Sequence, residues 1–144
     1  MIKIKSPASK KEFEDYYHLR WKILRKPWLQ PQGSEKDHME DDAFHFIALD
    51  EDEKIIGCCR LQMNTPDEAQ IRYMAVDDDW QGKGIGKSLL QEAEKTAMKQ
   101  GAGTIILEAR EKAIDFYKQN GYIIRKESYL LFNEIQHYTM SKPL

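Results

Sequence analysis

Residues 69–101 are AQIRYMAVDDDWQGKGIGKSLLQEAEKTAMKQG, an apolar run that leads through a glycine cluster into a long amphipathic stretch. The run from Ala69 to Val76 has the composition of a β-strand. From Gly84 to Gln100 the apolar residues recur with a period of 3.6, and Gly101 is a suitable helix C-cap. The segment therefore predicts a strand, a glycine-rich turn and an amphipathic helix.

The following apolar run, residues 104–109, is short and nearly all apolar, as expected for a strand buried on both faces. Strand, helix and strand in this order predict a crossover that joins a parallel pair. A second helix is expected over residues 112–119. Closing strands are expected near residues 122–124 and 136–140.

The chain before this segment predicts antiparallel pairing. The β-rich runs 44–49 and 55–63 flank a charged turn, which is typical of a hairpin, and the strand at 69–76 extends the same meander. Residues 1–7 alternate charged and apolar side chains and resemble a first strand. Strands paired in both directions predict an α+β fold with a mixed sheet.

A helix is expected between the first strand and the hairpin. Ser9 and Glu12 have the spacing of a capping box, and apolar residues then recur at helical intervals until Pro27. Residues 26–42 are polar, broken and acidic, which predicts a loop with at most a helical turn.

Size and charge limit the classes of function. The 144 residues are expected to form one domain, residues 1–144. The net charge of −2, from 22 Lys and Arg against 24 Asp and Glu, gives no global field that would draw the chain to nucleic acid or anionic lipid. No run suits a signal peptide or a membrane span, so we expect a cytoplasmic protein.

The two cysteines, Cys58 and Cys59, are neighbours in an apolar run. On an extended strand their side chains point to opposite faces, which argues against a disulfide or a metal site. We therefore expect reduced packing residues and no metal cofactor.

The glycine cluster indicates an anion site, because backbone N–H groups and the positive end of a helix dipole converge there. An ATP-binding P-loop would need glycine five positions before Gly86, where Gln81 stands. A dinucleotide-binding fingerprint starting at Gly82 would need glycine in place of Lys87. Neither nucleotide motif fits.

A third motif does fit. Gln81-Gly82-Lys83-Gly84-Ile85-Gly86 resembles the Q/R-x-x-G-x-G/A motif of the GCN5-related N-acetyltransferase (GNAT) superfamily. Ala113-Ile114-Asp115-Phe116-Tyr117 with Gly121-Tyr122 is similar to the A-x-x-F-Y…G-F/Y segment of that superfamily. The resemblance covers about residues 70–125, and the order of elements extends it to nearly the whole chain. Within the superfamily, residues 69–76 and 137–144 resemble small bacterial members of the ElaA and YjcF type. The chain departs from the pattern at Arg110, where the superfamily often has asparagine.

The resemblance implies the GNAT (acyl-CoA N-acyltransferase) fold, a mixed, twisted central sheet split in its middle and flanked by helices. Acetyl-CoA would lie in the split, and an amine acceptor would enter from the opposite face. Arg110 would reach either a CoA phosphate or the acceptor. The residues that would contact acetyl-CoA are Met74, Ala75, Val76, Gln81, Gly82, Lys83, Gly84, Ile85, Gly86, Lys87, Ser88, Arg110 and Tyr117.

The resemblance also implies catalytic roles. Tyr117 would be the general acid that protonates the departing thiolate. His45 and Glu108 are the candidates for a general base, although ordered water deprotonates the amine in some GNAT enzymes. Arg60 and Arg72 would either hold an anionic group or pair with the acidic loop.

The expected function is acetyl-CoA-dependent N-acetylation of a primary amine on a small molecule, by direct attack. The alternatives are a non-catalytic acyl-CoA-binding or sensing module, and an N-acetyltransferase that acts on proteins or peptides. The acidic run 35–42 is either a solvated loop or an attractor for a cationic amine such as a polyamine. A homodimer is expected by analogy only.

Overall fold

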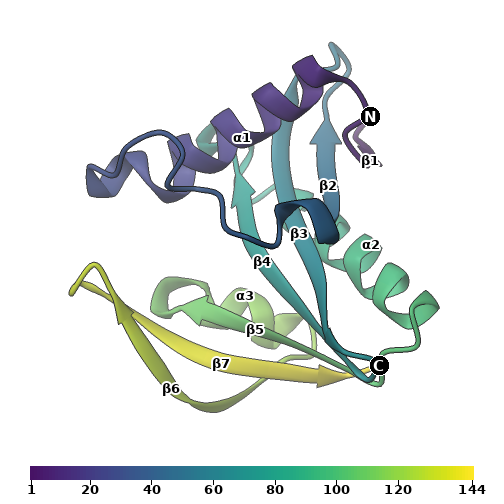
Figure 1. Cartoon of the computed structure of the whole chain (residues 1–144), viewed down its shortest axis with the longest axis vertical. Helices are drawn as coiled ribbons and strands as arrows, with labels where there is room; N and C mark the ends of the chain where they lie inside the picture. Colours follow the sequence, from purple (N-terminus) through teal and green to yellow (C-terminus); the bar gives the residue numbers. More distant parts are fainter.

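The computed structural model describes all 144 residues as one seven-stranded mixed sheet with helices on both faces (Figure 1). The strand order is β1-β2-β3-β4-β5-β7-β6. None of the helices has the length and apolar composition needed to cross a bilayer. The strands are β1 (Lys3–Lys5), β2 (Phe44–Leu49), β3 (Ile55–Thr65), β4 (Glu68–Val76), β5 (Thr104–Arg110), β6 (Ile123–Leu131) and β7 (Ile135–Pro143). The α-helices are α1 (Lys10–Leu24), α2 (Ile85–Lys99) and α3 (Ile114–Gln119).

The sheet consists of two antiparallel parts joined by one short parallel pair. Strands β1 to β4 form the predicted meander, and β5, β7 and β6 form the second part. The parallel pairing of β4 with β5 extends over only four residue pairs, from Glu68 with Thr104 to Ile71 with Leu107. Beyond these pairs the two strands diverge (Figure 1), so the predicted split in the sheet is confirmed.

A bulge in β4 begins where the split opens. Cys58 pairs with Ala75 and Arg60 with Arg72, so Cys59 alone lies opposite two residues of β4. One of those two residues, Tyr73, has φ of 56°, in the left-handed region that non-glycine residues rarely adopt. Because a bulge bends the strand that carries the extra residue, it turns the end of β4 away from β5.

Apolar side chains form a core on each face of the sheet. The larger cluster lies on the α2 face and includes Cys59, and the smaller lies on the α1 face and includes Cys58. Both cysteines are free and buried, as predicted, and burial raises the pKa of the Cys58 thiol to about 12. A thiol with so high a pKa is a weak nucleophile at neutral pH.

Helix α1 has the predicted N-terminus. The Ser9 hydroxyl accepts a hydrogen bond from the Glu12 amide at 3.0 Å, and the Glu12 carboxylate accepts one from the Ser9 amide at 3.4 Å. The helix expected over residues 112–119 is α3, and it begins later, at Ile114, because Glu111–Ala113 form a 3₁₀ turn before it. Further 3₁₀ turns occupy Lys26–Trp28, Glu40–Asp42 and Asp78–Trp80.

The closing strands were predicted too short. Strand β6 lies at the edge of the sheet, and most of its residues are exposed. Its sequence therefore has neither the continuous apolar run nor the regular alternation that predicts a buried or half-buried strand. Strand β7 also extends further than expected, to Pro143.

A substitution at Gly57 on β3 tests how closely α2 packs on the sheet. A Cβ atom at Gly57 would lie 2.8 Å from Cγ2 of Ile85 and 3.1 Å from Cδ1 of Leu89. We expect Gly57→Ala to lower the free energy of unfolding by about 1–3 kcal/mol, as overpacking does in well-packed cores. Gly103→Ala is the matched control, because a Cβ there meets no atom within 4 Å. Urea denaturation of both variants measures the difference, and equal stabilities would contradict close packing at Gly57.

Candidate active site

The glycine-rich turn exposes a row of backbone N–H groups at the start of α2. Gly82 and Gly84 have φ of 76° and 83°, and Gly84 is the N-cap of the helix. A side chain at either glycine would be strained at this φ. None of the amides from Gly82 to Lys87 donates a hydrogen bond to another backbone group. Free amides at the positive end of a helix dipole form a site for phosphate oxygens.

Two contacts fix this turn against the rest of the chain. The Gln81 side-chain amide donates to the Val76 carbonyl at 3.3 Å, which ties the turn to the end of β4. A Cβ at Gly86 would lie 3.1 Å from Cζ of Phe116, closer than an ordinary van der Waals contact, so the absence of a side chain at Gly86 helps α2 to pack closely against α3. The side chains of Lys83 and Lys87 are exposed beside the turn.

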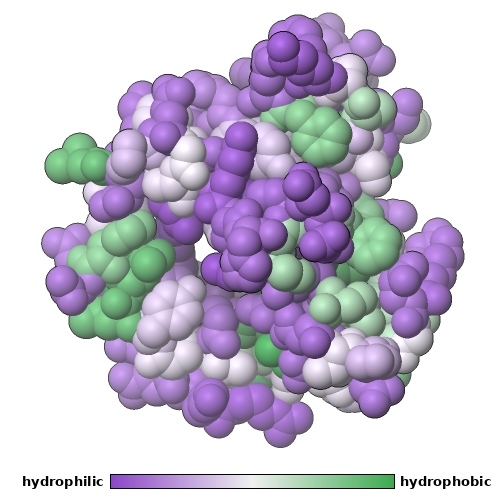
Figure 2. Space-filling view, in the orientation of Figure 1, coloured by the Kyte–Doolittle hydropathy of each residue, from purple (hydrophilic) through white to green (hydrophobic).

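The split between β4 and β5 contains a cleft of about 130 Å³. Figure 2 shows an opening near the centre of this face, rimmed mainly by hydrophilic residues. Five parts of the chain contribute to the cleft wall: β4, β5, α3, the end of α1 and the β6–β7 hairpin. The polar or charged residues among those that line it are Arg25, Gln70, Arg72, Tyr73, Glu108, Arg110, Tyr117, Tyr129 and His137.

Tyr117 lies on α3 and reaches the cleft from the α2 face of the sheet. Its ring packs edge-on against Phe116 and Tyr122, with centroid distances of 5.0 and 5.8 Å. The side chain is only 7% exposed, and burial raises the pKa of the phenol above its usual value. The hydroxyl is therefore protonated at neutral pH and can donate a hydrogen bond into the cleft.

The two candidate bases have different surroundings. Both ring nitrogens of His45 are engaged, Nδ1 with the Tyr16 hydroxyl and Nε2 with the Glu40 carbonyl, each at 2.7 Å. A carbonyl only accepts, so Nε2 carries the proton and Nδ1 accepts from Tyr16. Burial lowers the pKa of His45, which favours this neutral form. Glu108 lines the cleft instead, and the Thr139 hydroxyl lies 2.8 Å from its Oε2.

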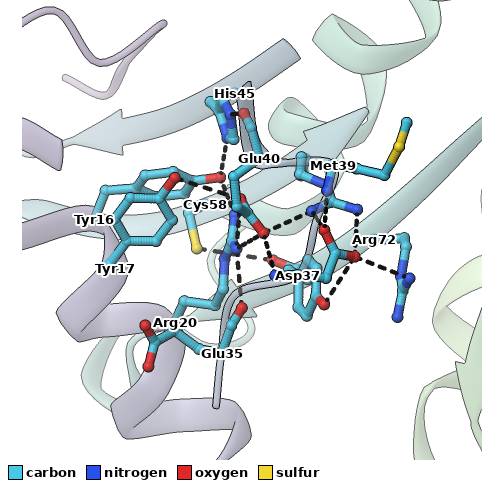
Figure 3. A network of polar contacts seen from close by, with 12 residues as sticks. Tyr16, Tyr17, Arg20, Glu35, Asp37, Met39, Glu40, His45, Cys58 and Arg72 are labelled. Carbon is cyan, nitrogen blue, oxygen red and sulfur yellow. Dashed lines mark hydrogen bonds and ion pairs between the residues drawn. The ribbon is translucent and has the colours of Figure 1, made fainter. Parts of the chain in front are cut away.

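A buried ion network lies beside the cleft on the α1 face (Figure 3). The side chains of Arg20 and Arg60 are fully buried. Glu40 binds both of them, with Oε1 2.9 Å from Arg20 Nη1 and Oε2 2.6 Å from Arg60 Nη1. Asp37 binds Arg60 at 2.6 Å and Arg72 at 3.2 Å. The acidic loop is thus anchored to α1, β3 and β4.

The network shows which of the two roles predicted for Arg60 and Arg72 applies. Both residues pair with the acidic loop. Burial alone would raise the pKa of Asp37, but the hydrogen bonds and charge of Arg60 hold that pKa well below its usual range. Within the acidic run 35–42, the side chains of Asp41 and Asp42 are exposed, and neither carboxylate pairs with an arginine of the network.

The roles of Asp37 and Arg20 in the ion network were not predicted from the sequence. Arg20 stands four residues after Tyr16 and four before Leu24, so it occupies the apolar face of its helix. An arginine at such a position was the available signal, because a buried guanidinium needs a carboxylate partner. No group of three or more His, Cys, Asp or Glu side chains is arranged to hold a metal ion.

Comparisons with known proteins agree with these features. Residues 13–122 match the model of a family described as the acetyltransferase (GNAT) family. A relative from Bacillus subtilis (strain 168), named as the uncharacterised N-acetyltransferase YjcF, is 28% identical over 134 residues, which is 93% of this chain and 94% of the relative.

Solved structures show the same fold. Escherichia coli ElaA superposes with a TM-score of 0.85 at 17% identity, covering 99% of both chains. A GNAT family acetyltransferase from Elizabethkingia anophelis with acetyl-CoA bound has a TM-score of 0.80 at 17% identity, covering 99% of this chain and 98% of the other. Identities this low establish the fold alone.

Glu40 tests the buried ion network. We expect Glu40→Gln to lower the free energy of unfolding by about 3 kcal/mol, because it leaves Arg20 buried without a carboxylate. Asp41→Asn is the matched control, since the neighbouring carboxylate is exposed, and it should change stability by no more than about 0.5 kcal/mol. Urea denaturation at neutral pH measures both, and a similar small effect for the two variants would contradict the role given to Glu40.

Proposed function

Because the chain belongs to the acetyltransferase (GNAT) family, we propose that it transfers the acetyl group of acetyl-CoA to a primary amine of a small acceptor. The proposal takes residues 1–144 as one acetyltransferase domain. The observation that carries it is the row of free amides at Gly82 to Lys87 next to a split sheet whose cleft contains Tyr117.

The glycine-rich turn supports binding of the CoA pyrophosphate. The free amides and the helix dipole supply hydrogen bonds and positive potential to phosphate oxygens. The exposed side chains of Lys83 and Lys87 add charge, while Gln81 and Ser88 flank the amides. In this proposal the pantetheine arm lies along the edge that β4 exposes from Met74 to Val76, where the strand has left β5.

The reaction requires a neutral amine, a polarised carbonyl and a proton for the thiolate. The amine nitrogen attacks the thioester carbon, so a C–N bond forms and the C–S bond breaks. A backbone N–H near Met74 or Ala75 would stabilise the charge that develops on the carbonyl oxygen. Tyr117 would donate a proton to the sulfur. The amine would give up its own proton to the base, so protons balance over the turnover.

Of the two candidate bases, we propose Glu108. It lines the cleft, and a carboxylate there can accept a proton directly or through one water. The nitrogens of His45 are already occupied by Tyr16 and Glu40, which supports a structural role for that residue.

Acetyl-CoA binding is the first test. We expect micromolar binding in isothermal titration calorimetry, with ATP and NAD silent, and loss of binding in Gly84→Glu, which puts a negative charge and a strained side chain at the N-cap. Gly101→Glu is the matched control, because Gly101 also has a positive φ and open surroundings but lies past the other end of α2. A folded wild-type protein, free of copurified CoA, that fails to bind acetyl-CoA would refute the proposal.

Tyr117→Phe separates catalysis from binding. The change removes only the hydroxyl, so we expect kcat to fall by about 100-fold or more while the Kd for acetyl-CoA stays the same. Tyr122→Phe is the control: its hydroxyl donates to Glu94 at 2.8 Å, so it should lose stability but not kcat. Binding of acetyl-CoA without turnover by the wild type over a broad panel of amines would indicate the non-catalytic alternative.

A further inference from the structure

Two arginines of the cleft have no acidic partner. Arg25 follows the last residue of α1, and Arg110 is the last residue of β5. Both line the cleft and both are half-buried. The ion pairs that involve arginine use only Arg20, Arg60 and Arg72. Arg25 and Arg110 are therefore partly desolvated cations without an ion-pair partner.

The two guanidinium groups bind the same backbone carbonyl. Nη1 of Arg25 and Nη2 of Arg110 each donate to the Leu24 carbonyl at 3.2 Å, and Nε of Arg25 donates to the Ser34 carbonyl at 3.1 Å. Each guanidinium has five N–H donors in a planar fork. Three hydrogen bonds to neutral carbonyls leave most of these donors free beside the cleft.

The electrostatics of this corner are unfavourable without an anion. Burial lowers the pKa of Arg110, and the neighbouring charge of Arg25 lowers it further. Arginine nevertheless stays protonated in proteins, so the two like charges persist side by side. A buried cation is costly unless it is paired, and a bound oxyanion would relieve both the desolvation and the repulsion.

The ion network does not neutralise this corner. It contains three guanidinium groups, those of Arg20, Arg60 and Arg72, and its two bridging carboxylates are Asp37 and Glu40. Both carboxylates are engaged within the network, and no ion pair joins either of them to Arg25 or Arg110. These pairs also leave Asp37 and Glu40 unable to attract a polyamine without breaking buried ion pairs.

The geometry of β5 relates this corner to the proposed chemistry. Leu107 and Ala109 point into the α2-face core, so Glu108 and Arg110 point to the opposite face. Two residues apart on a strand, they are separated by about 7 Å along it. A small acceptor can therefore present its amine near Glu108 and an oxyanion to Arg110. The cleft of about 130 Å³ is smaller than a typical ligand site, which suits one end of such a molecule.

We infer that the acceptor carries a carboxylate or phosphate group besides its amine, and that Arg25 and Arg110 bind this oxyanion. The inference rests on the proposed acetyl transfer and names the class of its acceptor. It assigns Arg110 to the acceptor and not to a phosphate of CoA.

Matched acceptors test the inference in the wild-type protein. The pairs are 4-aminobutyrate with butylamine and O-phosphoethanolamine with ethanolamine, and spermidine represents the polyamines. Turnover is followed as thiol release from acetyl-CoA, and binding of each probe is measured by calorimetry with CoA present. We expect kcat/KM or affinity to be at least about tenfold higher for an oxyanion-bearing member than for its partner without the oxyanion, in line with a charge-assisted hydrogen bond. The two pairs distinguish carboxylate from phosphate.

Arg25→Gln and Arg110→Gln test the residues. Each should raise KM or Kd for the oxyanion-bearing probe by about tenfold or more and leave the Kd for acetyl-CoA unchanged. Arg125→Gln is the control, because this exposed arginine of β6 does not line the cleft.

Three outcomes would overturn the inference: no preference for oxyanion-bearing probes, no effect of the two variants, or weaker acetyl-CoA binding in Arg110→Gln. Failure of the wild type to bind acetyl-CoA would instead refute the proposed function, so the two failures are distinguishable.

Discussion

The bulge at Tyr73 is the constraint on which the rest of the site depends. A regular β4 would continue its pairing with β5 past Ile71 and Leu107, and no cleft would remain between them. A non-glycine residue in the left-handed region costs about 1–2 kcal/mol. Contacts of the Tyr73 side chain offset this cost, because its hydroxyl donates to Asp37 at 3.3 Å and its ring lies 4.3 Å from the Arg20 guanidinium carbon. The ion network therefore also holds the backbone of the split.

The arginines around this bulge fall into two groups with different roles. Arg20, Arg60 and Arg72 are paired with carboxylates and fasten the acidic loop to the sheet. Arg25 and Arg110 converge on a single carbonyl and have no such partners. The first group organises the wall of the cleft, whereas the second leaves hydrogen-bonding capacity and charge unused there. Counting charged residues on this surface would not separate the two groups, but their partners do.

The sequence predicts the structural features that depend on residues close together in the chain. The capping box of α1, the hairpin, the amphipathic helix α2 and the glycine turn each follow from spacing within a short segment, and the structure contains all four. Pairing of Arg60 and Arg72 with the acidic loop was one of two predicted alternatives, but the pairing of Arg20 with Glu40 was not predicted, since the two are joined across a loop without periodicity. Arg110 and Leu24 are 86 positions apart, and no local pattern links them. Glu108 and His45 could be named as candidates, but only tertiary contacts distinguish their surroundings.

The glycine turn and the cleft differ in how they can change over evolution. The turn offers main-chain amides, which every amino acid other than proline possesses, and it requires glycine at only a few positions. The cleft offers side chains drawn from five separate parts of the chain. Substitutions at the cleft can therefore alter its charge and shape one position at a time while the turn stays intact. Under the proposed function, a chain with this division can come to accept a different amine through neutral substitutions in the cleft and still bind acetyl-CoA at the turn.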